Sequence, residues 1–246
     1  MIGTSSAINQ QDIKLKLFQE TKKVFIIGDV HGCLSELIKL LAIIDSKIAP
    51  DDEIIFVGDY VDRGPDSKGV VDLLIERQKN HPNKHVFIKG NHEDMLMTGD
   101  YWSMNGGAET LKSYGLDPLD FGISREFFKV HCPGPHVGFY KNLKHFYQVG
   151  NVVVVHAAID PWYTLDEQSI HTMIWERQFD KYDGDYKGGF TVVRGHTPVN
   201  KVVETRNQIM IDTGCVFGYK MTCLIIDPEN PADRSYIEVK SEQPEW

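Results

Sequence analysis

The chain has 246 residues, of which 26 are Lys or Arg and 35 are Asp or Glu, so its formal net charge is −9. With 41% apolar residues, the composition excludes a disordered or fibrous protein and fits a globular one. The negative charge argues against general nucleic-acid binding, which relies on clustered basic residues. No segment approaches the roughly 18 apolar residues of a membrane span. We therefore expect neither nucleic acid nor a membrane as partner.

Cellular location and domain organisation follow from the same simple features. The N-terminus lacks an apolar run of signal-peptide length, and the four cysteines form no CxxC pair. Both observations fit a protein of the reducing cytoplasm. We predict a single domain over residues 1–246, with residues 1–11 polar and flexible. The sequence gives no indication of the oligomeric state.

The first half of the chain alternates apolar runs of strand length with segments of helical periodicity. Three predicted strands each end at a glycine followed by a polar residue: residues 24–27, 53–57 and 85–88. Apolar residues recur at helical spacing after the first strand, and Asp66 or Ser67 can cap a helix after the second. This alternation is typical of an α/β protein.

The second half changes character twice. Residues 93–145 have helical periodicity interrupted by glycines and prolines, which predicts a helical cap. β-rich runs follow and predict a second sheet: residues 152–155, 190–193, 202–204, 209–211, 221–226 and 236–239. Because no repeat or linker separates the halves, we expect two layers of one domain.

Polar motifs stand at the ends of the predicted strands, where α/β sheets form their sites. They are Gly28-Asp-Val-His-Gly32, Gly58-Asp-Tyr-Val-Asp-Arg-Gly64, Gly90-Asn-His-Glu93, His156 and Gly195-His196. One such Asp or His alone is more often a turn former or a core histidine, but five together favour a site. Carboxylate, amide and imidazole donors without thiolate suit Mn, Fe or Zn. Two such cations can bridge a phosphoryl oxygen and activate water.

Together, these motifs resemble those of the PPP-family serine/threonine protein phosphatases, within the calcineurin-like metallophosphoesterase superfamily. Arg194-Gly-His-Thr-Pro198 belongs to this shared set. The bacterial and bacteriophage-lambda type is most similar, because it adds two motifs in matching order: Ile174-Trp-Glu-Arg177 and Ile211-Asp-Thr-Gly-Cys215. The resemblance spans residues 24–214. It implies an α/β fold, a four-layer α/β/β/α sandwich of two mixed sheets flanked by helices.

The same resemblance implies a centre of two divalent metal ions, with Mn²⁺ expected as the activator and Fe or Zn as alternatives. The first cation would be held by Asp29, His31 and Asp59. The second would be held by Asp59, Asn91, His156 and His196, so that one carboxylate bridges both ions.

Catalytic and phosphate-binding roles carry over as well. His92 would be the general acid that protonates a leaving alkoxide, and Asp62 would orient it. Arg63 and Arg177 would bind the phosphate oxygens, since a planar guanidinium matches that anion with two hydrogen bonds. Asn91 would also contact the phosphate.

We thus predict a metal-dependent phosphatase that hydrolyses phosphoserine and phosphothreonine in phosphoproteins or phosphopeptides, by direct attack of a metal-bound water. The main alternative is a symmetrical diadenosine tetraphosphate hydrolase, which the segment Asp212-Thr-Gly-Cys-Val-Phe-Gly218 resembles. Asp62 weighs against it, because bacterial hydrolases of that type usually lack this acid and carry GNHD instead of GNHE. A catalytically inactive binding module is the other alternative, and the complete set of ligand positions argues against it.

Overall fold

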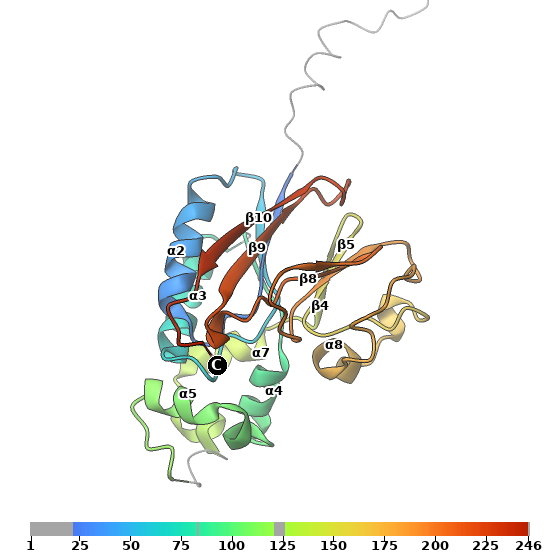
Figure 1. Cartoon of the computed structure of the whole chain (residues 1–246). Helices are drawn as coiled ribbons and strands as arrows, with labels where there is room; N and C mark the ends of the chain where they lie inside the picture. The colour runs from blue at the N-terminus through green and yellow to red at the C-terminus, as the bar shows by residue number, and fades with distance from the viewer. Residues whose placement is uncertain (1–21, 83, 121–125, 246) are drawn as a thin grey trace, which may run out of the picture.

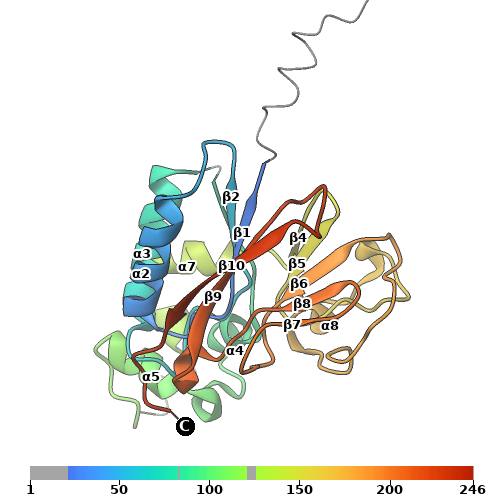
Figure 2. The same cartoon turned by 45° about the horizontal axis from the view of Figure 1, so that its top comes forward.

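The computed structural model describes residues 22–82, 84–120 and 126–245, and the predicted flexible segment 1–11 lies outside them. Two mixed five-stranded sheets face each other (Figures 1 and 2). The first has the order β10 (Arg234–Lys240), β9 (Lys220–Ile226), β1 (Val24–Ile27), β2 (Glu53–Phe56), β3 (His85–Phe87). In it, β1, β2 and β3 are parallel, and β9 is antiparallel to β1 and β10.

The second sheet also combines both kinds of pairing. Its order is β4 (Phe146–Val149), β5 (Val152–Val155), β6 (Thr191–Arg194), β8 (Gln208–Met210), β7 (Val203–Glu204). The three central strands are parallel, and β4 and β7 are antiparallel at its edges. The expectation of two mixed sheets is confirmed.

Helices cover the outer faces of both sheets. α2 (Leu34–Asp45) and α3 (Ser67–Asn80) pack on the first sheet, and α8 (Ile170–Trp175) packs on the second. The predicted helical cap consists of α4 (Asn91–Thr98), η1 (Trp102–Asn105), α5 (Gly107–Ser113), η2 (Phe127–His131) and α7 (Gly134–Lys141). Two short turns complete the described elements, η3 (Leu165–Glu167) and η4 (Cys215–Phe217).

The central strands β1 and β5 are apolar throughout, because both of their faces are buried. In β1, Phe25 and Ile27 pack in the core beneath α2 and α3, whereas Val24 and Ile26 belong to the core between the sheets. A third core lies between the second sheet and α8. The molecule thus has four layers: the helices α2 and α3, the first sheet, the second sheet and α8. One apolar core lies between each pair of adjacent layers.

Most predicted elements have the predicted position, and the differences have local causes. Asp66 caps α3, because its side chain accepts a hydrogen bond from Gly69 N at 2.7 Å. The sequence analysis missed β4, whose residues are only partly buried and include an exposed Gln148. Its strand conformation comes from antiparallel pairing with β5. Within the described residues, no helix combines the length and apolarity needed to cross a membrane.

Candidate active site

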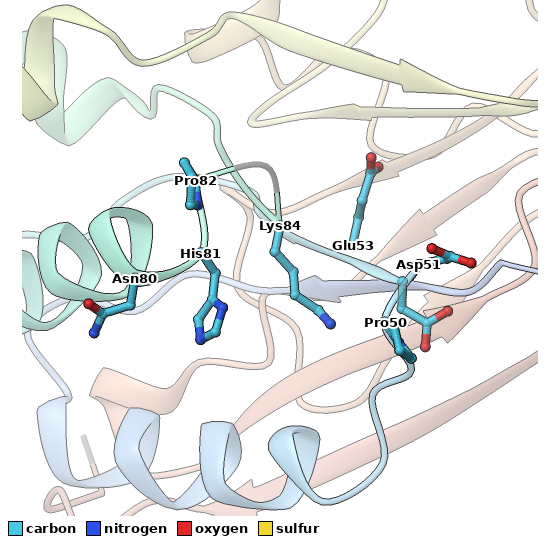
Figure 3. A pocket seen from close by; sticks show the side chains of 8 residues that line it. Pro50, Asp51, Glu53, Asn80, His81, Pro82 and Lys84 are labelled. Atoms are coloured by element: carbon cyan, nitrogen blue, oxygen red, sulfur yellow. The ribbon is translucent and has the colours of Figure 1, made fainter.

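The polar motifs gather at one edge of the sheets, where the strands end. A separate cavity lies at the opposite edge, beside the N-terminal ends of β2 and β3. That cavity, of about 550 Å³, has walls that include Asp51, Glu53, His81 and Lys84 (Figure 3). Its polar groups serve the local chain: Lys84 Nζ, for example, donates to the carbonyl of Ala49 at 2.8 Å. The chemistry expected from the sequence belongs to the opposite edge.

Backbone strain is concentrated in the motifs. Among the described residues, six that are not glycine have φ in the left-handed region: His31 (43°), Asp59 (50°), Asp62 (73°), Arg63 (67°), Tyr101 (58°) and His196 (69°). Five of these six belong to the predicted site. Such conformations cost about 1–3 kcal/mol each and persist where the surrounding fold enforces them.

Two glycines let the motifs approach each other closely. A Cβ atom at Gly195 would lie 1.9 Å from Asp29 Oδ1, and one at Gly90 would lie 2.0 Å from Asp59 Oδ1. Any side chain at these positions would collide with a carboxylate. The glycines therefore serve the placement of Asp29 and Asp59.

One cluster of donor atoms comes from α4, β5 and β6. His156 Nε2 lies 3.0 Å from Asn91 Oδ1 and 3.2 Å from His196 Nδ1, which is itself 3.0 Å from Asn91 Oδ1. His156 Nδ1 donates to the Val57 carbonyl at 3.0 Å, so Nε2 of the neutral ring carries a lone pair. The lone pairs of His156 Nε2 and Asn91 Oδ1 thus face and repel each other. A cation bound between them would remove this repulsion.

Asp59 joins this cluster to a second one. Its Oδ1 lies 3.4 Å from His156 Nε2, and its Oδ2 lies 3.4 Å from His31 Nε2. His31 Nδ1 donates to the Val61 carbonyl at 2.8 Å, which again leaves a lone pair on Nε2. Asp59 therefore offers one oxygen to each cluster.

Asp29 borders the cluster that contains His196. Its Oδ2 accepts a hydrogen bond from His196 N at 3.1 Å. Burial, together with the negative charges of Asp212 and Asp59, raises the pKa of Asp29 well above its usual range. Three buried carboxylates repel one another, and neighbouring cations relieve that repulsion.

Burial also sets the protonation states that metal ligation requires. It lowers the pKa of His196 to about 2, with His156 adding to the effect. It lowers the pKa of His31 well below the usual value, together with the nearby Arg63 charge. Although burial opposes ionisation of Asp59, the surrounding histidines hold its pKa well below the usual range. Neutral imidazoles and an ionised carboxylate are the forms that bind metals.

His92 and Asp62 form a buried pair beside these clusters. His92 Nδ1 lies 2.7 Å from Asp62 Oδ2, and His92 Nε2 faces Asp59 Oδ2 at 4.0 Å. The carboxylate can only accept, so Nδ1 carries the proton and Nε2 points toward the clusters. Donor atoms of His92, His31 and Asp59 lie within 4.8 Å of one another.

The helical cap holds Asp62 in place, which the sequence analysis did not anticipate. Asp62 Oδ1 accepts hydrogen bonds from Trp102 Nε1 at 2.8 Å and Thr110 Oγ1 at 2.7 Å. All three side chains are buried. No motif or periodicity marks Trp102 as part of the site, since only tertiary packing brings it to the Asp62 loop.

The two predicted phosphate-binding arginines flank the clusters from opposite sides. Arg63 Nη1 donates to His31 Nε2 at 2.7 Å, and the guanidinium lies 5.6 Å above the centre of the Phe217 ring. Arg177 Nε lies 3.1 Å from His196 Nε2. Both arginines are partly exposed, so a phosphate arriving from solvent can reach them.

Two further residues organise the loops and were not among the predicted site residues. Glu93 accepts hydrogen bonds from the backbone of Asp59 at 3.0 Å and Gly90 at 2.9 Å; burial and the Asp59 charge raise its pKa to about 8. Arg194 is fully buried and donates both to Asp180 and to the Ala157 carbonyl. It thereby ties the loop after Arg177 to the turn after β5.

Comparison with known proteins agrees with this geometry. The family model of the calcineurin-like phosphoesterases matches residues 22–225. This chain belongs to that family. As a calcineurin-like phosphoesterase it is a metal-binding hydrolase of phosphate esters, with the clusters around Asp59 as the candidate site for two divalent ions.

Relatives of this calcineurin-like phosphoesterase carry two kinds of names. The asymmetrical bis(5'-nucleosyl)-tetraphosphatase PrpE of Oceanobacillus iheyensis is 31% identical, over 90% of this chain and 94% of its own length. Serine/threonine-protein phosphatase 1 of Salmonella typhimurium is 29% identical, over 82% of this chain and 90% of its own length. A serine/threonine phosphatase structure from Saccharomyces cerevisiae shares the fold, with a TM-score of 0.65 and 17% identity over 92% of this chain and 82% of its own.

Proposed function

We propose that this phosphoesterase hydrolyses phosphoserine and phosphothreonine monoesters in proteins, by direct in-line attack of water on phosphorus. One observation carries the proposal, the buried His92–Asp62 pair directed at the metal clusters. The serine or threonine alkoxide is a strongly basic leaving group, and a nearby imidazolium can protonate it as it departs. Asp62 orients the imidazole through its hydrogen bond to Nδ1.

The donor set fits two divalent cations, and we propose Mn²⁺. Asp29, His31 and Asp59 would hold one, and Asp59, Asn91, His156 and His196 would hold the other. When bound, such cations polarise a phosphoryl oxygen and make water nucleophilic near neutral pH. The placement of the two Asp59 oxygens, each 3.4 Å from an imidazole of a different cluster, supports its bridging role.

The remaining residues bind and orient the substrate in this proposal. Arg63 and Arg177 bind the non-bridging phosphate oxygens, because a planar guanidinium can donate two parallel hydrogen bonds to the anion. The Asn91 amide nitrogen is available to a phosphate oxygen, since Oδ1 faces the histidines. Together these contacts align phosphorus between the attacking water and His92.

A second candidate function rests on the names of the relatives. Several of them are called asymmetrical bis(5'-nucleosyl)-tetraphosphatases, whereas the sequence analysis weighed the symmetrical type. Hydrolysis of a dinucleoside tetraphosphate expels a phosphate group, which is less basic than an alkoxide. Such a reaction depends less on a general acid, so the His92–Asp62 pair favours the phosphoprotein.

Rates of the manganese-loaded enzyme on three substrates test the proposal. A phosphothreonine peptide should have a higher kcat/KM than a phosphotyrosine peptide or diadenosine tetraphosphate. If the dinucleotide is the best substrate, chromatography of the products separates the rivals, because asymmetric cleavage yields ATP and AMP, whereas symmetric cleavage yields two ADP. Either result would contradict the phosphoprotein assignment.

A further inference from the structure

A second group of metal-ligating side chains lies outside the candidate active site, at the N-terminal end of α2. Cys33 precedes this helix, Glu36 lies in its first turn, and Cys215 begins η4, between β8 and β9. One donor atom of each residue lies within 4.8 Å of those of the other two. All three residues are buried, with exposed fractions of 0%, 0% and 2%.

The Glu36 carboxylate is satisfied on one oxygen only. Oε1 accepts hydrogen bonds from Glu242 N at 2.8 Å and Gln243 Nε2 at 3.2 Å, both in the segment after β10. In residues 22–82, 84–120 and 126–245, no hydrogen-bond donor reaches the buried Oε2. A buried polar atom without a partner costs about 1–3 kcal/mol, and more when it is charged. Oε2 is therefore free to act as a ligand.

We propose that Cys33, Glu36 and Cys215 bind one thiophilic divalent cation of the Zn²⁺ class. Two thiolates and a carboxylate are a donor set that Zn²⁺ accepts, whereas the candidate active site contains no sulfur. The cation replaces the two thiol protons, which pass to solvent. Two sulfurs bound at about 2.3 Å to a tetrahedral Zn²⁺ are about 3.8 Å apart, so the cluster contracts by about 1 Å or less.

The position of the cluster favours the negative charge that this site needs. α2 is 12 residues long, and its N-terminus carries the positive end of the helix dipole toward Cys33 and Glu36. In the metal-free chain the Cys33 thiol donates to the His31 carbonyl oxygen at 3.6 Å. A cation bound here fastens the loop that carries Phe217 to α2, and thus steadies the ring beneath Arg63.

Cobalt spectroscopy tests this site independently of enzymatic activity. The full chain is reduced with a phosphine, shown to have four free thiols, and titrated with Co²⁺. Only sulfur ligation produces a thiolate-to-cobalt charge-transfer band, so cobalt in the sulfur-free active site does not contribute to it. We expect the band to reach its maximum within three equivalents of Co²⁺, because the candidate active site takes up as many as two of them. Cys33→Ala and Cys215→Ala should each abolish or shift it.

Two more variants sharpen the experiment. Glu36→Gln keeps the shape of the side chain but removes the charge, so the Co²⁺ affinity should fall by at least roughly 10-fold. Cys223→Ala removes an equally buried thiol that lies in β9, outside the cluster, and should leave the band intact.

The absence of a band in the reduced wild-type chain would overturn the proposal. So would an unchanged band in Cys215→Ala, which remains decisive even if Cys33→Ala misfolds beside His31. Loss of the band in Cys223→Ala, with circular dichroism showing a native fold, would likewise place the sulfur ligands elsewhere.

Discussion

His92 is the side chain on which the proposed chemistry depends most directly. His92→Asn should lower kcat on a phosphothreonine peptide by roughly 10²–10⁴-fold, the range for one proton-transfer catalyst. The loss on p-nitrophenyl phosphate should be smaller, because nitrophenolate leaves without a proton. Steady-state kinetics on both substrates, with metal content checked by mass spectrometry, measures the difference.

A matched control is His136→Asn, which removes another buried histidine with an aspartate partner, Asp72, far along the chain from the motifs. It should change the two rates by the same factor. Equal losses in His92→Asn, or loss of metal from that variant, would exclude His92 as the acid.

Asp59 matters for metal binding, since each of its two side-chain oxygens faces a different candidate ligand cluster. Asp59→Asn should therefore lose more bound metal and more activity than His31→Ala, which removes one ligand from one cluster. Metal per chain after dialysis, measured by mass spectrometry, decides this comparison. Retention of two ions with near-normal turnover in Asp59→Asn would refute the bridging role.

For single residues, the motifs predicted which side chains would lie together. The predicted donors of His156, His196 and Asn91 do converge within 3.2 Å of one another. Residues that act through contacts between distant segments left no such pattern. Trp102 meets Asp62 across 40 positions, and no periodicity or motif signals that contact.

Among the elements, the helical cap has a consequence for the site, because η1 and α5 supply the groups that hold Asp62. Trp102→Phe removes the indole donor to Asp62 Oδ1 and should lower the free energy of unfolding by about 1.5–3 kcal/mol, the usual worth of a hydrogen bond to a charged group. It should also lower kcat more on phosphothreonine than on p-nitrophenyl phosphate. Urea unfolding and the two-substrate assay measure the two effects.

Phe127→Leu provides the comparison, since Phe127 packs on Trp102 at 5.3 Å between ring centroids but has no polar side-chain atom to offer Asp62. It should destabilise the cap without changing the ratio of the two rates. A Trp102→Phe variant with an unchanged ratio would show that the cap only supports the fold.

Secondary structure was predictable where one signal dominated. β1 and β5 are continuous apolar runs, and their burial on both faces explains why the pattern was clear. β4 combines partly buried residues with an exposed Gln148, so its sequence does not distinguish a strand from a loop. Its pairing with β5 decides the conformation, and pairing is a tertiary property.

For the whole molecule, His85 should make stability depend on pH. Burial lowers its pKa to about 4 from 6.5, and Arg77 Nε donates to its Nε2 at 3.3 Å, which requires the neutral ring. The unfolded chain binds this proton more readily, so stability is full above pH 6.5 and falls as the pH drops toward about 4. Urea unfolding of the chelator-treated chain across this range should show the decline.

His85→Gln should flatten that decline, because glutamine does not titrate. His81→Gln serves as the control, since it alters the neighbouring histidine but keeps the backbone carbonyl that His85 contacts. Parallel curves for His85→Gln and the wild type would assign the acid sensitivity to other groups.

The pairing of β1 with β9 makes completion of the first sheet a late event in biosynthesis. Val24 lies opposite Ile226, so a strand translated near the start waits for one translated near the end. Until then the nascent chain presents one open edge of an apolar strand on the ribosome, where chaperones recognise such surfaces. Asp29 follows that strand, and its partner His196 is also made late. Assembly of the site is thereby postponed until almost the whole polypeptide has emerged, and premature termination yields chains that cannot acquire it.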